Sequence, residues 1–326
     1  MYQRFMKSIK SHLQPRHYLK GFLAAKTDTD HDDYLFVYKK GMPHRSDGTR
    51  QENNPVKSGP GNTAFVRNFY AFLNENGVLD AETYEQKLER EIERPGNAVL
   101  DKLRAVRISK NEAFNISEII DHADRKVFAR YVAGMAARTK KTRGLFENAV
   151  RSTNQKIKDQ PFTYRSVVSH LTAEDKAALH RQTQKTDPEF NDSTAVRLPE
   201  NYLKNYERET LENESFLQTM FGLIDEFAQI ILRMKWQLRV TQPDRIFTGD
   251  APVWWSDLTE PGANLLFPVS SRAIFCATLN RTILETVFFE HRKEFISIVR
   301  DVFARHCTEL YCSDHQRWLV DFFNKR

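Results

Sequence analysis

Hydrophobic positions form short runs near both ends of the chain. Aromatic and β-branched residues cluster at 34–39 (YLFVYK), and a second apolar segment, 63–73, follows a polar stretch rich in Gly, Pro and Asn. In the last third, turn-forming residues separate five short runs: WQLRV, RIFTGD, PVWWS, NLLFPVS and AIFCATL. Such runs are typical of antiparallel strands. The pattern predicts strands in both terminal thirds, with segment 63–73 paired to strand 34–39.

The middle of the chain has the period of helices instead. Apolar residues at spacings of three, four and seven predict helices over 81–107, over 117–138 and from residue 212 onward. We expect Pro95-Gly96 to break or kink the first helix and Ser117 to cap the second. Three further helices are predicted, at 173–182, 291–306 and 314–323.

Together these elements predict one α+β domain over residues 1–326. Strands from the N- and C-terminal parts would form an antiparallel sheet, and 81–235 would be a mainly helical section.

Composition places the chain among water-soluble proteins. Among its 326 residues, no apolar run reaches the roughly 18–20 residues of a membrane span. The N-terminus lacks the apolar core of a signal peptide. Three cysteines cannot form a fully paired disulfide framework. We expect a cytoplasmic protein without membrane association.

The positive charge is concentrated in one segment. The chain has 49 Lys+Arg against 43 Asp+Glu, a net charge of +6. Residues 138–158 carry that whole excess, because they hold one anion, Glu147, and seven cations: Arg138, Lys140, Lys141, Arg143, Arg151, Lys156 and Lys158. Such a stripe is expected where a protein contacts DNA or RNA phosphates. The alternative is a set of solvated cations that follow the C-terminal end of a helix.

Acid–base candidates occur in two short strings. His12 and His17 flank Pro15 and Arg16, and a histidine exchanges protons near neutral pH. Asp250 follows Thr248-Gly249 where one predicted strand turns into the next. It could bind a metal or orient a histidine, or it could fix the corner by bonding to the local backbone.

A third candidate group lies on the predicted helix 81–107. Glu85 and Glu89 share a helix face, with Glu91 nearby. Like charges so placed repel unless a cation lies between them. A divalent metal would be one such cation and would suit phosphodiester hydrolysis. The neighbouring Lys87, Arg90 and Arg94 are the other candidates for this role.

Several short motifs occur in an order that resembles one family. They are His12-x-x-Pro15-x-x-Tyr18-Leu19-x-x-Phe22, Asn68-Phe69-Tyr70, the helix with Glu85, Leu88 and Glu91, the segment 247–253 and the segment 267–270. The chain resembles the uncharacterised bacterial domain-of-unknown-function 4238 family from His12 to about Cys312. Where that family usually has Thr-Ser-Asp-Asn-Pro, residues 248–252 read Thr-Gly-Asp-Ala-Pro. The resemblance implies no established activity, and its matched polar positions, His12, Glu85, Glu91 and Asp250, are candidate catalytic residues.

Two functional hypotheses follow. The first is a nucleic-acid-directed protein that binds DNA or RNA through the basic segment. It would be a hydrolase, metal- or His-assisted, if the four catalytic candidates converge in one pocket. The alternative is a non-catalytic module that docks a protein partner through an aromatic surface around Trp254-Trp255.

Overall fold

The computed structural model describes nine stretches of the chain and a few isolated residues. The stretches are 10–25, 32–40, 55–73, 79–106, 113–159, 213–241, 245–256, 263–279 and 292–324, and the rest are 162–163, 177, 181, 195–196 and 204. The chain divides into two compact units: Met1–Thr142 with Leu217–Arg326, and Arg143–Phe216. That one domain spans residues 1–326 stays a prediction.

A five-stranded antiparallel sheet organises the first unit. In spatial order it contains β12 (Trp254–Trp255), β13 (Asn264–Ser270), β14 (Ala273–Thr278), β10 (Lys235–Val240) and β7 (Ala113–Asn115). Four of these strands were predicted from the apolar runs of the last third. The fifth, β7, comes from the section predicted to be mainly helical.

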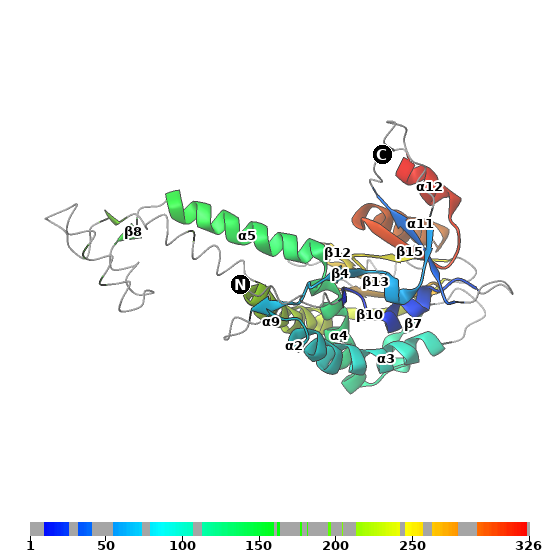
Figure 1. The fold of residues 1–326 in the computed structure, drawn as a ribbon. Helices are drawn as coiled ribbons and strands as arrows, with labels where there is room; N and C mark the ends of the chain where they lie inside the picture. Colours follow the sequence, from blue (N-terminus) through cyan, green and yellow to red (C-terminus); the bar gives the residue numbers. More distant parts are fainter. Residues whose placement is uncertain are drawn as a thin grey trace, which may run out of the picture. The chain divides into compact units, whose positions relative to one another are not determined.

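Helices cover both faces of this sheet, as Figure 1 shows. Side chains alternate along each strand, so Phe267 and Phe275 contact Phe128 of α4 (His122–Ala137) on one face. On the other face, Leu266 and Ile274 join the core cluster of α11 (Arg292–His306). Burial on both faces explains why β14 is buried at every position.

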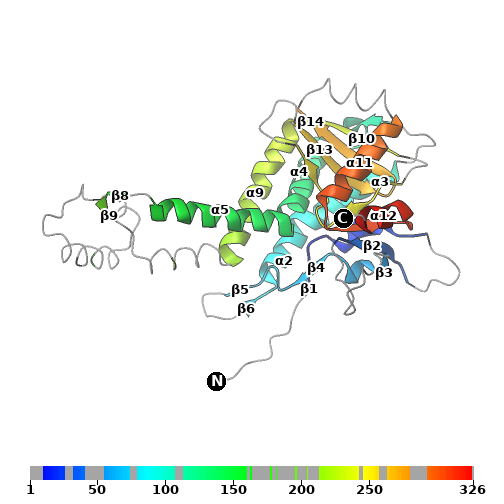
Figure 2. The same ribbon diagram turned by 90° about the horizontal axis from the view of Figure 1, so that it is seen from above.

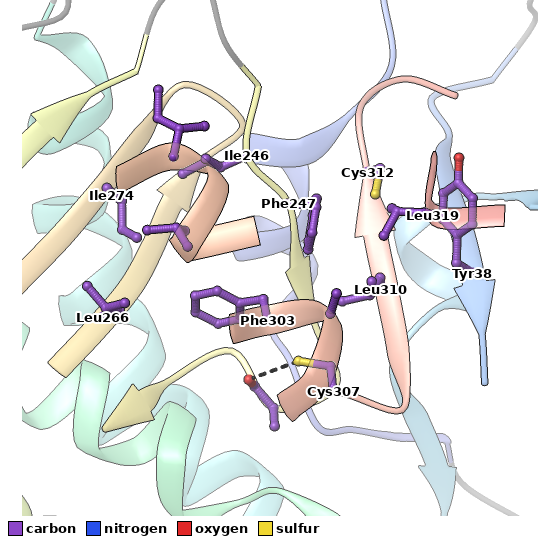
Figure 3. Packing of buried hydrophobic residues seen from close by; sticks show 14 of the residues in the cluster. Tyr38, Ile246, Phe247, Leu266, Ile274, Phe303, Cys307, Leu310, Cys312 and Leu319 are labelled. Carbon is purple, nitrogen blue, oxygen red and sulfur yellow. Dashed lines mark hydrogen bonds between the residues drawn. The ribbon is translucent and has the colours of Figure 1, made fainter. Parts of the chain in front are cut away.

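A four-stranded antiparallel sheet joins the two ends of the chain. Its order is β11 (Thr248–Gly249), β15 (Glu309–Cys312), β2 (Leu35–Lys39) and β3 (Val56–Ser58). N-terminal strands thus complete a sheet with C-terminal ones, which confirms the predicted α+β class. Between this sheet, α11 and α12 (Arg317–Asn324) lies the buried cluster of Figure 3, where the Cys307 thiol donates to the Ala251 carbonyl at 3.3 Å.

The segment 63–73 pairs differently from the prediction. Its strand β4 (Phe65–Arg67) pairs with β1 (Lys10–His12), and β3 takes the place beside β2. Ala64 and Asn68 have φ values of 53° and 55°. These left-handed residues bound β4 on both sides and limit it to three residues. The place beside β2 is taken by β3, which is equally short.

The helix predicted over 81–107 does not break at Pro95-Gly96. It runs as α2 (Thr83–Leu88), the π-helical turn η3 (Glu89–Glu93) and α3 (Arg94–Ala105). Pro95 is the second residue of α3, and the winding changes directly before it, from the π-helical turn η3 to α-helix. Gly96 lets α3 approach α4, because a Cβ there would lie 2.1 Å from the Tyr131 ring.

The helix predicted over 117–138 begins later, at His122. Ser117 lies in the short turn η4 (Ile116–Glu118), and the Asp121 carboxylate caps α4 by accepting from the Asp124 amide at 2.8 Å. Helix α4 packs against α9 (Asn213–Arg233), as Figure 2 shows, and Arg130 pairs with Asp225 at 2.9 Å.

The remaining elements are short, apart from one long helix. Most of the basic segment forms this helix, α5 (Lys140–Asp159), which the periodicity did not predict. The helix predicted at 173–182 falls almost wholly outside the described residues. The other elements are α1 (Arg16–Leu19), η1 (Lys20–Phe22), η2 (Pro60–Asn62), β5 (Phe72–Leu73), β6 (Leu79–Asp80), β8 (Phe162–Thr163) and β9 (Ala195–Val196). Within the described stretches, no helix has the length and apolar character needed to cross a bilayer.

Candidate functional site

The end of β1 and the start of α1 bring a histidine and an arginine together. Arg16 Nε and a terminal guanidinium nitrogen both lie 3.3 Å from His12 Nε2. A guanidinium can only donate, so Nε2 must be the accepting nitrogen of a neutral imidazole.

Its surroundings keep the His12 ring neutral. Burial lowers the pKa of His12 below 6.5, and the positive charge of Arg16 lowers it further. Glu93 and the backbone of Thr63 act in the opposite direction and are outweighed. Nδ1 is buried and makes no hydrogen bond of regular geometry. At neutral pH this histidine is therefore able to accept a proton.

Glu85 of α2 lies against the same strand end. Its Oε1 accepts from the His12 backbone amide at 3.5 Å. Burial raises the pKa of Glu85 above 4.5, and the negative charge of Glu93 raises it further, whereas Arg138 and Arg16 lower it less. This carboxyl therefore holds its proton to a higher pH than an ordinary glutamate.

The π-helical turn brings a second carboxylate to Glu85. Glu93 lies eight residues further on, which in a regular helix would offset the two by about 80° around the axis. The wide turn η3 takes up one extra residue, so the offset falls to about 20°. Glu93 forms an ion pair with Arg138, whose side chain is 1% exposed. Arg138 thus supplies the cation that two neighbouring carboxylates require.

Two buried tyrosines complete the surroundings of Arg138. The Tyr70 hydroxyl donates to the His12 carbonyl at 3.3 Å, and burial raises its pKa. Burial also raises the pKa of Tyr131, which the nearby Arg138 opposes. The Tyr131 hydroxyl and Arg138 Nε are buried without a hydrogen-bond partner among the described residues. Buried polar atoms without a protein partner commonly bond to water or a ligand.

We call six of these residues the His12 cluster: His12, Arg16, Tyr70, Glu85, Glu93 and Arg138.

Strained backbone lies on the strand that faces His12. Phe65 is paired with His12 in the β1–β4 ladder, and Ala64 before it has a positive φ of 53°. For a residue with a Cβ this conformation costs about 1–2 kcal/mol. The Ala64 carbonyl accepts from the Leu13 amide at 2.8 Å, which helps to hold it. Strain of this kind clusters at functional sites.

A pocket of about 400 Å³ adjoins the cluster. Its lining includes Leu13 and Phe65, which are the chain neighbour and the strand partner of His12, and Thr63, whose backbone acts on the His12 ring. Lys140 and Asp250 line the pocket as well. The pocket and the His12 cluster therefore share the β1–β4 wall.

Asp250 lies in the pocket wall but makes no contact with His12 or Glu85 that would complete one site. Its Oδ1 accepts from the amides of Thr308 at 2.8 Å and Glu309 at 3.1 Å, and its Oδ2 accepts from the Thr308 hydroxyl. We call these three residues the Asp250 corner. The predicted alternative, bonds to the local backbone, is wrong in its partners, because these amides belong to a segment 58 and 59 residues further along the chain.

Glu91 also lies outside the cluster. It pairs with Arg90 at 2.8 Å, which lowers the pKa of Glu91, and Glu89 pairs with Arg94 at 3.4 Å. Neighbouring arginines thus take the place that a metal could have had. Among the described residues, no group of three or more His, Cys, Asp or Glu is arranged to hold a metal ion.

Arg138 is not available to a surface phosphate, which corrects its place in the basic segment. The charge pattern alone gave no sign that Arg138 ends the buried helix α4 and turns inward to Glu93.

The other cations of the basic segment lie on α5. Lys140 and Lys141 are exposed in the first unit, and Lys141 Nζ lies 3.1 Å from His306 Nδ1. In the second unit, Arg143 is half-buried and pairs with Glu147 at 3.1 Å. Arg151 and Lys156 are exposed, and the side chain of Lys158 is outside the described part. Lys140 and Lys141 do follow the C-terminal end of α4 at Ala137, as that alternative expects, but they lie in the first turn of a second helix, α5.

Neither tryptophan of the proposed docking surface forms an exposed patch. Trp254 is partly buried against the core cluster, and Trp255 packs on Phe227 with ring centroids 5.5 Å apart. The protein-docking hypothesis stays a prediction.

Four members of the cluster escaped the sequence-based choice of catalytic residues, and one of them, Arg138, was predicted only as a phosphate-contacting cation. Glu93 is out of phase with Glu85 in a regular helix, so only the π-helical turn reveals it. Tyr70 stood in a family motif without a role, and Arg16 was noted only as a neighbour of the histidines.

Comparison with known proteins gives one match. A family model described as "Protein of unknown function" matches residues 10–313. No curated protein and no solved structure matches the chain.

Proposed function

Since the chain belongs to the DUF4238 family of proteins of unknown function, we propose a function from the site itself: His-assisted hydrolysis of phosphodiesters in nucleic acid. The observation that carries this proposal is that a neutral His12 imidazole and a Glu85 carboxyl whose pKa is raised lie at the same strand end, where Glu85 accepts from the His12 backbone amide. Arg16 and Glu93 act on both groups, so the two share one electrostatic environment. A base and an acid poised near the working pH are what hydrolysis requires.

The reaction would use each group once. His12 Nε2 takes a proton from a water molecule as the water oxygen bonds to phosphorus. The bond from phosphorus to the leaving oxygen breaks, and that oxygen takes the proton held by Glu85. Solvent then returns a proton to Glu85 and removes one from His12, so the net change is the addition of water.

Arginines suit the charge of the substrate. Arg16 is exposed and lies on His12 Nε2, so its guanidinium can move to a phosphate oxygen when the substrate arrives. Lys140 in the first unit, and Arg151 and Lys156 in the second, would supply further phosphate contacts. We expect this activity in the cytoplasm.

The test is cleavage of end-labelled single-stranded RNA and DNA by the purified full chain, with EDTA present. We expect His12→Ala and Glu85→Gln each to lower kcat/KM about 10²–10⁴-fold. Matched controls are His17→Ala, which removes a histidine paired with Asp101, and Glu91→Gln on the same helical segment; both should stay near wild type. The proposal fails if the wild-type chain cleaves neither polymer, or if the His12 and Glu85 variants cleave as well as the controls.

A pH profile adds an independent test. Activity should fall at low pH as His12 becomes protonated and at high pH as Glu85 ionises. Because the pKa of His12 lies below 6.5 and that of Glu85 above 4.5, we expect a bell-shaped profile of kcat/KM with its maximum on the acid side of neutrality. Loss of the alkaline limb in Glu85→Gln would support the assignment, and an unchanged profile would contradict it.

A further inference from the structure

The pocket beside the His12 cluster combines an apolar floor with polar groups. Leu13, Ala64 and Phe65 contribute apolar surface, and Ser58, Asn62 and Thr63 contribute hydroxyl and amide groups. Its volume of about 400 Å³ falls in the range of small-ligand sites, roughly 300–1,000 Å³. A ligand with an apolar ring face and polar edges fits such a lining.

Most of the charge in the pocket wall is already compensated. The Asp250 carboxylate accepts from Thr308 and Glu309, as described above. The Glu309 carboxylate pairs with Lys39 at 3.2 Å and accepts from the Tyr311 hydroxyl at 3.0 Å. Neither of these two carboxylates is therefore free to bind a ligand.

Lys140 differs from these groups. Its side chain is exposed, lines the pocket, and makes no hydrogen bond or ion pair with any described residue. It also begins α5, where a cation is unfavourable next to the positive end of the helix dipole. A bound anion would relieve that repulsion. The charge available to a ligand in this pocket is positive.

The position of the pocket relates this anion to the proposed chemistry. Two residues that line the pocket are direct neighbours of His12. Leu13 follows His12 in the chain, and Phe65 pairs with His12 in the β1–β4 ladder. A strand of nucleic acid whose phosphodiester lies at His12 would therefore have its neighbouring nucleotide at the pocket.

We propose that this pocket receives one unpaired nucleotide of the substrate, with the base on the Leu13–Ala64–Phe65 surface and a phosphate on Lys140. This inference rests on the proposed function for the identity of the ligand. A base must leave the helical stack to enter a pocket, so the site selects single-stranded nucleic acid over duplex. The same chemistry would admit a free nucleoside monophosphate.

Binding to the full chain carrying His12→Ala tests this inference without cleavage. The probes are a fluorescent single-stranded oligonucleotide, the same sequence as a blunt duplex, a nucleoside monophosphate and inorganic phosphate. We expect the single strand to bind at least tenfold more tightly than the duplex. The monophosphate should compete with it, and inorganic phosphate should compete much less.

Lys140 and Lys141 form a matched pair, since both are exposed in the first turn of α5 and only Lys140 lines the pocket. We expect Lys140→Glu to weaken single-strand binding at least tenfold. Lys140→Ala should reduce the slope of log K against log salt by about one, as for one lost phosphate contact. Lys141→Ala should change the slope less.

Four outcomes would overturn the inference: duplex binding as tight as single-strand binding, inorganic phosphate competing as well as the monophosphate, an unchanged affinity in Lys140→Glu, or equal effects of the two lysines. Cleavage that persists under any of these outcomes would leave the proposed function standing. Pocket binding without cleavage by the wild-type chain would overturn the proposed function alone.

Discussion

The His12 cluster and the Asp250 corner each contain an acidic residue of a family motif, and the surroundings of the two carboxyl groups differ. At the corner, one carboxylate accepts two backbone amides and a hydroxyl, so its hydrogen-bonding capacity is largely used by the fold. In the cluster, burial raises the pKa of Glu85, and the negative charge of Glu93 raises it further. Of these two motif residues, only Glu85 lies in surroundings that favour the protonated form, which is the form that the proposed hydrolysis requires.

The largest expected effect concerns the ion pair that holds the cluster together. Arg138→Met leaves the Glu93 carboxylate without its buried partner, so the free energy of unfolding should fall by about 3–5 kcal/mol. Urea denaturation followed by far-UV circular dichroism measures it. The control is Arg130→Met on the same helix, because Arg130 pairs with Asp225 at the surface and should cost at most about 1 kcal/mol. Equal losses in the two variants would mean that the Arg138–Glu93 ion pair contributes no more to stability than a surface ion pair.

The next effect concerns the Asp250 corner. Asp250→Ala removes an acceptor from two amides and a hydroxyl, and we expect a loss of about 2 kcal/mol in the free energy of unfolding. Thermal and urea unfolding measure this loss. Asp225→Ala, which removes a carboxylate that is 64% exposed, should cost less than about 1 kcal/mol. If Asp250→Ala were as stable as wild type, the hydrogen bonds of Asp250 would not stabilise the fold, and this difference between the two regions would be wrong.

The smallest expected effect is a gain in the free energy of unfolding. Because the pKa of Glu85 is raised above 4.5 in the folded protein, the folded state binds this proton more tightly than the unfolded chain does. The resulting stabilisation is fully present below pH 4.5 and is lost as pH rises through the folded-state pKa. Glu85→Gln should therefore be more stable than wild type at pH 7, by less than about 1 kcal/mol, and the gap should close near pH 4. Urea denaturation at the two pH values measures this gap.

Glu91→Gln is the control for that sign. Arg90 lowers the pKa of Glu91, so the wild-type carboxylate contributes stability above pH 4.5 that is lost as pH falls. This substitution should lower the stability at pH 7. A stabilising Glu91→Gln, or a destabilising Glu85→Gln, would contradict the electrostatic account of the helix.

Much of the architecture followed from local patterns. The apolar runs of the last third predicted β10, β13 and β14, and the apolar periodicity of 291–306 predicted α11, because burial of one face imposes a period on the sequence. Strand partners were harder. Segment 63–73 pairs with β1 and not with β2, since pairing depends on which strand occupies each sheet edge.

The candidate site divides in the same way. The sequence drew attention to His12 and Glu85, which lie together in the structure, although it could not separate them from Glu91 and Asp250. All four are polar residues in similar motifs. Their difference lies in neighbours supplied by distant segments: Arg138 and Glu93 act on Glu85, whereas Thr308 and Glu309 bond to Asp250.

By itself, the sequence determined the α+β class, most of the helices and strands, and the concentration of positive charge in residues 138–158. Only the tertiary structure decided that Arg138 is buried in an ion pair, that Glu93 shares a face with Glu85, and that Lys140 lines a pocket next to His12. The physical reason is that periodicity reports which residues are buried, whereas the pKa and the partners of a charged group depend on segments far away in the chain.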